Sequence, residues 1–174
     1  MEILYTKDEI HKRVVELGKQ ITNDYKDKTP IFVCVLTGSF IFMADLVREV
    51  NLSLTVDFMS VSSYKNGMVS TGDVEIQKDL TQSIRGRDVI IVEDIVDTGL
   101  TLYRLKELLS SRGPSSIRIC TLLDKPSSRI KTELVVDYIG FQIPKKFVIG
   151  YGLDYAGKYR NLPHIAIVND NNAI

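Results

Sequence analysis

Three short runs of mainly apolar, β-branched residues constrain the fold more than any other feature of the sequence. The runs are Ile31–Leu36, Asp88–Val92 and Ile117–Leu123. Apolar residues at nearly every position, rather than at every second one, are typical of strands buried on both faces of a parallel sheet. Segments with helical spacing alternate with these runs. The sequence therefore predicts an α/β fold with an open, mainly parallel, doubly wound sheet flanked by helices.

Three helices are predicted from capping residues and apolar spacing. The first begins at Thr6 and Glu9, which have the spacing of a capping box. Ser39 is expected to cap the second helix, and the third carries the inward-facing leucines of Leu102–Leu109. Further strands are expected at Leu54–Val61, Asp73–Leu80, Val135–Ile139, Phe147–Ile149 and Ile165–Val168.

Ser62–Gly72 is a polar stretch between two of these strands, with Asn66-Gly67 at its middle. Asn-Gly is a common hairpin turn. A stretch of this length without apolar periodicity predicts a turn-rich loop, which is either a hairpin tip or a mobile lid.

The charge balance and the short apolar runs exclude several classes of protein. The chain has 174 residues, and 22 Lys+Arg balance 22 Asp+Glu, which argues against nucleic acid or an anionic membrane as the main partner. This length, without repeats or linkers, predicts a single domain over residues 1–174. The absence of a signal-peptide pattern or a membrane-length apolar run predicts a cytoplasmic location. Cys34 and Cys120 are expected to be buried free thiols, and no Cys/His cluster suggests zinc.

The segment Glu93–Thr101 carries the clearest chemistry, because it joins a predicted strand to a predicted helix. Ligands of open parallel sheets bind outside the carboxyl ends of the strands. The free N–H groups and positive dipole of the helix start, with two threonine hydroxyls, suit a phosphate. Adjacent Glu93 and Asp94 suit either Mg²⁺ or a pair of sugar hydroxyls. The segment predicts a sugar-phosphate site in which Asp97 exchanges a proton.

Glu93–Thr101 reads EDIVDTGLT and resembles the phosphoribosyl diphosphate motif of type I phosphoribosyltransferases. Further segments narrow the resemblance to the hypoxanthine-guanine phosphoribosyltransferases of purine salvage. They are Leu36–Ser39, Ser63-Tyr64 with Ser70–Asp73, Leu122–Lys125, and Phe147–Tyr155 continuing to Arg160–His164.

The resemblance implies the type I fold, with a small base-binding hood made by the N-terminal and C-terminal segments. It implies transfer of ribose 5-phosphate from 5-phospho-α-D-ribosyl 1-diphosphate to N9 of hypoxanthine or guanine, with Mg²⁺ as cofactor. By the same resemblance, Glu93 and Asp94 contact the ribose hydroxyls directly or through the metal, and Asp97 takes or returns the proton at N7 of the purine. The phosphate is expected to meet Thr98, Gly99, Leu100 and Thr101.

The resemblance also assigns residues to the base. Lys125 points its ammonium at the purine O6, which separates 6-oxopurines from adenine, since an amino group cannot accept from a lysine. Phe147 stacks on the base, and Val148 offers backbone hydrogen bonds to its edge.

For the diphosphate, the resemblance implies backbone contacts from Thr37-Gly38, in some relatives by way of a cis peptide bond after Leu36. By the same resemblance, Arg160 binds the diphosphate. Asp154 joins Glu93 and Asp94 as a candidate metal ligand.

Ser63 and Tyr64 lie in the loop that is expected to close over the reaction (about 63–73) and exclude water. The chain departs from many relatives at Thr37 and Leu100, where lysines are common. The loss of both cations leaves more of the phosphate binding to backbone donors, Mg²⁺ and Arg160.

Two alternatives stay open at this point. One is a phosphoribosyltransferase for another base, xanthine above all. The other is a nucleotide-sensing regulatory protein on the same fold, against which the presence of Asp97 and the zero net charge argue. The expected partners are small molecules and, by family analogy, further copies of the same chain in a homo-oligomer.

Overall fold

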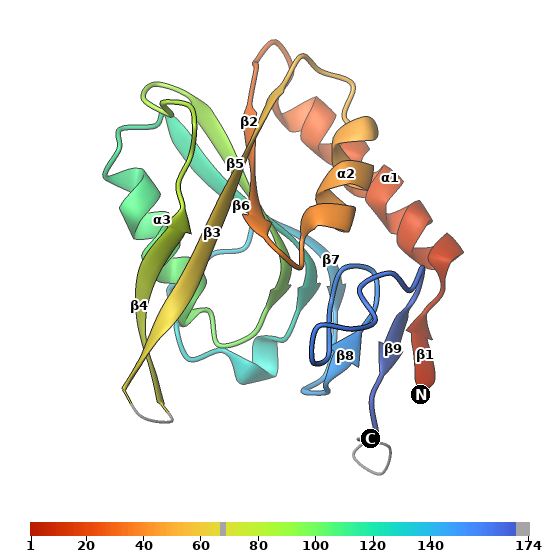
Figure 1. The fold of residues 1–174 in the computed structure, drawn as a ribbon. Coiled ribbons are helices and arrows are strands. Elements are labelled where there is room, and N and C mark those ends of the chain that lie inside the picture. Colours follow the sequence, from red (N-terminus) through yellow and green to blue (C-terminus); the bar gives the residue numbers. More distant parts are fainter. Residues whose placement is uncertain (67–68, 170–174) are drawn as a thin grey trace.

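A six-stranded sheet with the strand order β4-β3-β2-β5-β6-β7 forms the centre of the computed structural model (Figure 1). The structure describes residues 1–66 and 69–169, and for residues 64–66 and 69–72 it describes the backbone alone. All neighbouring strands of this sheet are parallel except β3 and β4, which form an antiparallel hairpin. The predicted doubly wound α/β fold is confirmed. The strands are β2 (Ile31–Leu36), β3 (Thr55–Asn66), β4 (Val69–Lys78), β5 (Asp88–Val96), β6 (Ser116–Asp124) and β7 (Tyr138–Gln142).

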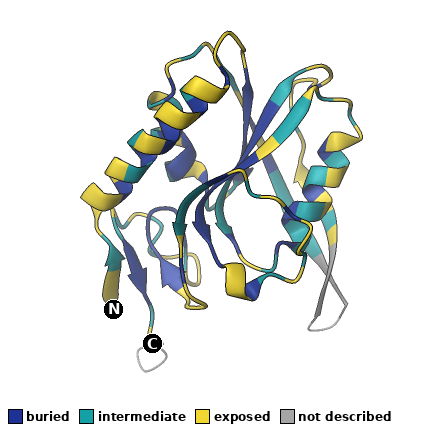
Figure 2. Ribbon diagram, turned by 180° about the vertical axis from the view of Figure 1, so that it is seen from behind, coloured by how far each residue is buried: buried dark blue, intermediate teal, exposed yellow. Residues whose placement is uncertain are grey.

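Helices cover both faces of the sheet. Alternate residues of β2 divide between the faces, so that Phe32 packs with α1 (Lys7–Asp24) and α2 (Phe40–Arg48), whereas Val33 packs with α3 (Leu100–Ser110). Figure 2 shows the same division, with the buried sides of the helices turned toward the strands. Every residue of β2 from Ile31 to Val35 is buried, as the continuous apolar run predicts. No helix of the described residues is long and apolar enough to cross a membrane.

The predicted helix caps have different outcomes. The capping box of α1 is confirmed, since the Glu9 N–H donates to Thr6 Oγ1 at 3.3 Å and the Thr6 N–H to the Glu9 carboxylate at 2.8 Å. Ser39 occupies the N-cap position of α2, but its hydroxyl does not cap the helix. The side chain is fully buried and donates instead to the Val35 carbonyl.

A second, antiparallel sheet joins the two ends of the chain in the order β1-β9-β8. It consists of β1 (Glu2–Tyr5), β8 (Val148–Ile149) and β9 (Ile165–Ile167). β1 was not expected from the sequence, because its four residues carry no clear period and its partner β9 is at the other end of the chain. The sheet lies beside the carboxyl ends of β6 and β7 (Figure 1), and its strands come from the N-terminal and C-terminal segments that are expected to form the hood.

Several predicted boundaries differ from those of the structure. Most of the polar stretch Ser62–Gly72 belongs to the β3–β4 hairpin, in which Asn66 pairs with Val69, so the hairpin alternative describes it better than a turn-rich loop. β5 continues through Glu93 and Asp94 to Val96. β7 begins at Tyr138 rather than at Val135, because the Asp137 carboxylate accepts the Ile119 N–H at 2.8 Å just before the ladder with β6 starts.

Candidate active site

The candidate site lies at the carboxyl edge of the parallel sheet, where β2, β5 and β6 end side by side. The segments that follow these strands are joined by backbone hydrogen bonds. The Lys125 N–H donates to the Val96 carbonyl at 2.9 Å, and the Ile130 N–H donates to the Thr98 carbonyl at 2.9 Å. The loop Asp97–Gly99 is thereby held against the segment after β6.

Glu93 and Asp94 are partly buried near the end of β5. Burial raises the pKa of Glu93 well above its ordinary value, and the negative charge of Asp94 raises it further. Burial also raises the pKa of Asp94, although the Ile95 N–H and the positive charge of Arg160 oppose that shift. Two carboxylates withdrawn from water favour a cation or hydroxyl donors beside them. The pair therefore fits a metal ion or a sugar diol, the two roles expected from the sequence.

Asp97 and Lys125 meet across the ends of β5 and β6. The Lys125 ammonium lies 3.6 Å from the Asp97 carboxylate, and the two side chains are 9% and 53% exposed, respectively. The lysine is thus anchored in the protein, whereas the aspartate faces the open side of the site. This arrangement brings together a group that can exchange a proton and a fixed positive charge.

The start of α3 forms a small cavity of about 240 Å³, lined by residues that include Glu93, Asp97, Thr98 and Thr101. Gly99 occupies the N-cap position with φ +80°, a left-handed conformation that favours glycine. Gly99 has no side chain to cap this helix, and the Leu100 N–H donates to Thr98 Oγ1 at only 3.4 Å, so the first turn still offers N–H groups to an anion. Leu100, the first helical residue, adds no charge. The cavity has the donors of a phosphate site.

The β3–β4 hairpin reaches this cavity. The hydroxyls of Ser63 and Thr101 share a hydrogen bond, which joins β3 to the first turn of α3. The side chain of Tyr64 lies outside the described residues. Of the two expected loop residues, Ser63 is therefore next to the candidate phosphate site.

The Thr37-Gly38 turn packs against its neighbours through two glycines. The Leu36–Thr37 peptide bond is cis, one of the possibilities that the resemblance implied. A Cβ on Gly38 would lie 1.7 Å from the Asp94 carboxylate, and one on Gly152 would lie 2.1 Å from the Gly38 carbonyl. No side chain larger than hydrogen fits at either position, so the turn lies directly between β5 and the segment after β8.

Arg160 and Asp154 face this turn from the segment after β8. The Arg160 guanidinium lies 3.1 Å from the Asp154 carboxylate and donates to the Gly152 carbonyl at 2.6 Å. Asp154 also accepts the Gly157 N–H at 2.8 Å. The expected diphosphate residues are thus organised around Gly152, with Thr37 exposed beside them.

Val148 begins β8 of the second sheet, and Phe147 directly precedes it. The Phe147 ring is 50% exposed and meets Tyr155 edge to face, with 5.6 Å between the ring centroids. Val148 is buried, and the Phe147 carbonyl accepts the Val168 N–H at 3.0 Å. An exposed aromatic face is available to a flat ligand.

The expected metal ligands do not form a protein cage. Within the part of the chain that the structure describes, no three His, Cys, Asp or Glu side chains converge on a point suited to a metal ion. Mg²⁺ usually takes only one or two carboxylates and completes its shell with waters and substrate phosphates. Glu93 and Asp94, side by side near the end of β5, could supply such a partial ligand set, and Asp154 offers a further carboxylate in the segment after β8.

Arg129 is a residue of the site that the sequence did not indicate. It forms a buried ion pair with Asp124 and donates to the Asp97 carbonyl at 3.3 Å. It also packs beneath Gly99, where an added Cβ would lie 2.9 Å from the Arg129 Cδ. An arginine after a 3₁₀ turn resembles any surface residue in the sequence, so no local pattern could have identified it.

The fold is that of a phosphoribosyltransferase. The sequence profile of the phosphoribosyl transferase domain matches residues 2–156, and the chain belongs to this family. It is 55% identical over 170 residues to the hypoxanthine phosphoribosyltransferase of Escherichia coli K12, covering 97% of this chain and 95% of that protein. It is 51% identical to the hypoxanthine-guanine phosphoribosyltransferase of Bacillus subtilis, covering 96% and 92%. The crystal structure of a Staphylococcus aureus hypoxanthine phosphoribosyltransferase superposes with a TM-score of 0.95 at 48% identity, covering 98% and 92%.

Proposed function

We propose that the chain is a purine salvage enzyme that transfers the 5-phosphoribosyl group of 5-phospho-α-D-ribose 1-diphosphate to N9 of hypoxanthine or guanine. The products are the nucleoside monophosphate and diphosphate. The observation that carries the proposal is the contact of 3.6 Å between Lys125 and Asp97, next to the start of α3 at Gly99. This geometry offers a phosphate site, a proton acceptor and a fixed cation within one short stretch of the sheet edge.

In the proposed reaction, the bond from C1 of the ribose to the diphosphate breaks and the bond from C1 to N9 forms. The purine loses one proton, and Asp97 accepts it at N7. The carboxyl groups of Glu93 and Asp94 can stabilise the positive charge that develops on the ribose as the leaving group departs. The first turn of α3 holds the 5′-phosphate through its N–H groups and the Thr101 hydroxyl.

Lys125 and Phe147 are proposed to select the base. The ammonium of Lys125 donates to O6 of a 6-oxopurine, and the exposed ring of Phe147 stacks on the base. Val148 offers its backbone to the base edge. The 6-amino group of adenine cannot accept from a lysine, so adenine is a poor substrate in this proposal.

Mg²⁺ is the proposed cofactor, with Glu93, Asp94 and Asp154 as its candidate protein ligands. When bound, it would neutralise negative charge on the diphosphate leaving group. Arg160 and the backbone of Thr37-Gly38 would orient the diphosphate. The metal matters more in this chain because Thr37 and Leu100 carry no charge.

One assay tests the proposal. The purified protein is incubated with Mg²⁺, phosphoribosyl diphosphate and, in separate reactions, hypoxanthine, guanine, xanthine or adenine. We expect nucleotide and diphosphate in equal amounts from hypoxanthine and guanine, and almost none from adenine. A parallel reaction with excess chelator is expected to stop. Failure to form nucleotide from hypoxanthine or guanine would contradict the proposal, and product from xanthine alone would favour the alternative base.

Self-association is also proposed. Val56 and Phe58 lie two residues apart on β3, so they point to the same face of the sheet, and both are exposed. Sedimentation velocity of the wild type and of Phe58→Asp tests this proposal. A wild-type dimer or tetramer that dissociates in the variant is expected, and a monomeric wild type contradicts it. The cytoplasmic location and the closing motion of the hairpin stay predictions.

A further inference from the structure

Tyr151 has a backbone conformation that the surrounding structure must hold in place. It is a non-glycine residue with φ +52°, and it is only 7% exposed. A left-handed conformation is unfavourable for residues with a side chain and persists where neighbouring contacts fix it. The Tyr151 N–H donates to the Leu162 carbonyl at 2.9 Å, which closes the segment between β8 and β9 on itself.

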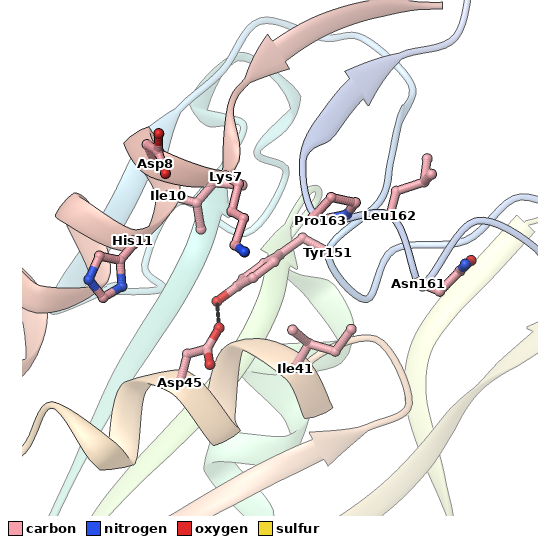
Figure 3. A pocket seen from close by; sticks show the side chains of 10 residues that line it. All are labelled: Lys7, Asp8, Ile10, His11, Ile41, Asp45, Tyr151, Asn161, Leu162 and Pro163. Atoms are coloured by element: carbon pink, nitrogen blue, oxygen red, sulfur yellow. Dashed lines mark hydrogen bonds between the residues drawn. The ribbon is translucent and has the colours of Figure 1, made fainter.

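The side chain of Tyr151 links this segment to another part of the molecule. Its hydroxyl donates to the Asp45 carboxylate on α2, as Figure 3 shows. Burial raises the pKa of Tyr151, and the negative charge of Asp45 raises it further, so the hydroxyl stays protonated and remains a donor. The two residues are 106 positions apart in the sequence.

Both ends of this link lead to the proposed diphosphate residues. On one side, α2 begins immediately after the Thr37-Gly38 turn. On the other, Tyr151 precedes Gly152, whose N–H donates to the Arg160 carbonyl at 2.9 Å and whose own carbonyl accepts from the Arg160 guanidinium at 2.6 Å. Gly152 lies against the Gly38 carbonyl so closely that a Cβ there would be 2.1 Å away. The chain leads from the Thr37-Gly38 turn into α2, the hydrogen bond joins α2 to Tyr151, and Gly152 next to Tyr151 packs back against the turn. These contacts form a closed loop of neighbours.

We infer that Tyr151 and Asp45 are positioning residues for the diphosphate, because their hydrogen bond keeps Arg160 and Asp154 opposite the Thr37-Gly38 turn. This inference rests on the proposed function. The link reaches α2, which follows β2, whereas Lys125 follows β6, and β5 lies between these two strands. We therefore expect its loss to weaken diphosphate binding more than base binding.

Tyr151→Phe tests the inference, because it removes only the hydroxyl and retains the buried ring. Small displacements of binding groups cost about one to two orders of magnitude in well-oriented sites. We expect the dissociation constant for diphosphate with Mg²⁺, measured by calorimetry, and the KM for phosphoribosyl diphosphate to rise about tenfold. The KM for hypoxanthine is expected to change by less than about twofold.

Variants of Asp45 provide the matched comparison. Asp45→Asn retains an acceptor for the hydroxyl and is expected to stay near the wild type, whereas Asp45→Ala is expected to match Tyr151→Phe. The double variant Tyr151→Phe/Asp45→Ala should bind diphosphate no more weakly than either single variant, since all three remove the same link. Arg48→Ala removes the exposed ion-pair partner of Asp45 and serves as the control that leaves binding unchanged.

Two results would overturn the inference. One is unchanged diphosphate affinity in Tyr151→Phe. The other is a parallel loss of affinity for diphosphate and hypoxanthine together with a lower melting temperature, which would indicate a general structural role. Failure of the proposed function is distinguishable, because the wild type itself would then neither bind diphosphate nor form nucleotide.

Discussion

At the scale of single residues, Asp97 and Lys125 have contrasting surroundings although their charged atoms lie 3.6 Å apart. A catalytic base must reach the substrate and exchange its proton with it, which suits a side chain that is half exposed. A recognition cation must stay in one place, which suits an ammonium that is nearly buried. The exposed Asp97 therefore suits the proposed proton transfer, and the nearly buried Lys125 suits the proposed recognition of the base.

Asp97→Asn tests the proton-transfer role. The amide has nearly the same shape and still offers an oxygen to Lys125, but it cannot accept the proton from the purine. We expect kcat to fall about 10²- to 10⁴-fold, with the melting temperature nearly unchanged because the side chain is 53% exposed. Steady-state kinetics and thermal unfolding measure the two effects. Turnover equal to that of the wild type would remove Asp97 from the mechanism.

Lys125→Met tests the base-selecting role. Methionine preserves most of the apolar stem but cannot donate to O6. Hydrogen bonds to charged groups contribute about 1.5–3 kcal/mol, so the KM for hypoxanthine is expected to rise about 10- to 150-fold. Diphosphate affinity should remain unchanged. Lys19→Met, at an exposed position of α1, is the control for loss of a positive charge. An equal rise in the constants for both substrates would argue against a role specific to the base.

At the scale of secondary-structure elements, the start of α3 depends on Gly99. Gly99→Ala imposes a left-handed conformation on a residue with a side chain, at a cost of about 1–2 kcal/mol. It also brings a Cβ within 2.9 Å of Arg129 and 3.0 Å of Leu134. Gly86→Ala is the matched control, because φ there is +70° and nothing lies within 4 Å of the added Cβ. We expect both variants to lose stability in urea unfolding, Gly99→Ala more so, and only Gly99→Ala to bind nucleoside monophosphate more weakly. Equal losses in stability and binding would contradict the packing argument.

Elements whose determinants are local could be predicted from the sequence. The capping box of α1 needs only Thr6 and Glu9, and the parallel strands need only continuous apolar runs. The same holds for the core of the site, since Glu93–Thr101 is contiguous and contains a strand end, a loop and a helix start. Local chemistry therefore indicated both the phosphate site and its neighbouring carboxylates.

Features that depend on distant partners could not be predicted. β1 is a strand only because β9 pairs with it from the other end of the chain. The Tyr151–Asp45 hydrogen bond and the contact of Arg129 with the Asp97 carbonyl join residues 106 and 32 positions apart. Periodicity and residue spacing cannot predict such pairs, because the two residues come together only when the elements pack in the folded protein.

At the scale of the whole molecule, the candidate site is divided between the two sheets. The six-stranded sheet supplies the carboxylates, the helix start and Lys125, and the second sheet supplies Val148 together with Phe147, which directly precedes β8. The proposed diphosphate segment, Gly150–Arg160, lies in the connection from β8 to β9 and packs against the turn after β2. The relative position of the two sheets therefore sets the distance between the proposed sugar and base sites.

The stability of the whole fold in acid is expected to depend on Asp57, which joins β3 to the segment after β4. Its carboxylate is 2% exposed and accepts the N–H groups of Phe58, Thr81 and Gln82 at 2.8, 2.9 and 3.0 Å. Burial alone would raise the pKa of Asp57, but these bonds and the Thr81 hydroxyl hold it below the ordinary value of 3.8. Because the folded-state pKa is lowered, the stabilising effect is present above about pH 4 and is lost as the pH falls through the folded-state pKa.

Asp57→Asn removes this effect, since its NH₂ group cannot accept the backbone N–H groups. We expect a loss of about 1–3 kcal/mol in the free energy of unfolding at pH 7. The decline of that free energy below pH 4 should be shallower than in the wild type, because one carboxylate with a lowered pKa is gone. Urea unfolding at pH 7, 4 and 3 measures both effects. Asp73→Asn, at an exposed carboxylate of the same hairpin, is the control. An identical decline in Asp57→Asn and the wild type would show that other carboxylates cause the loss of stability in acid.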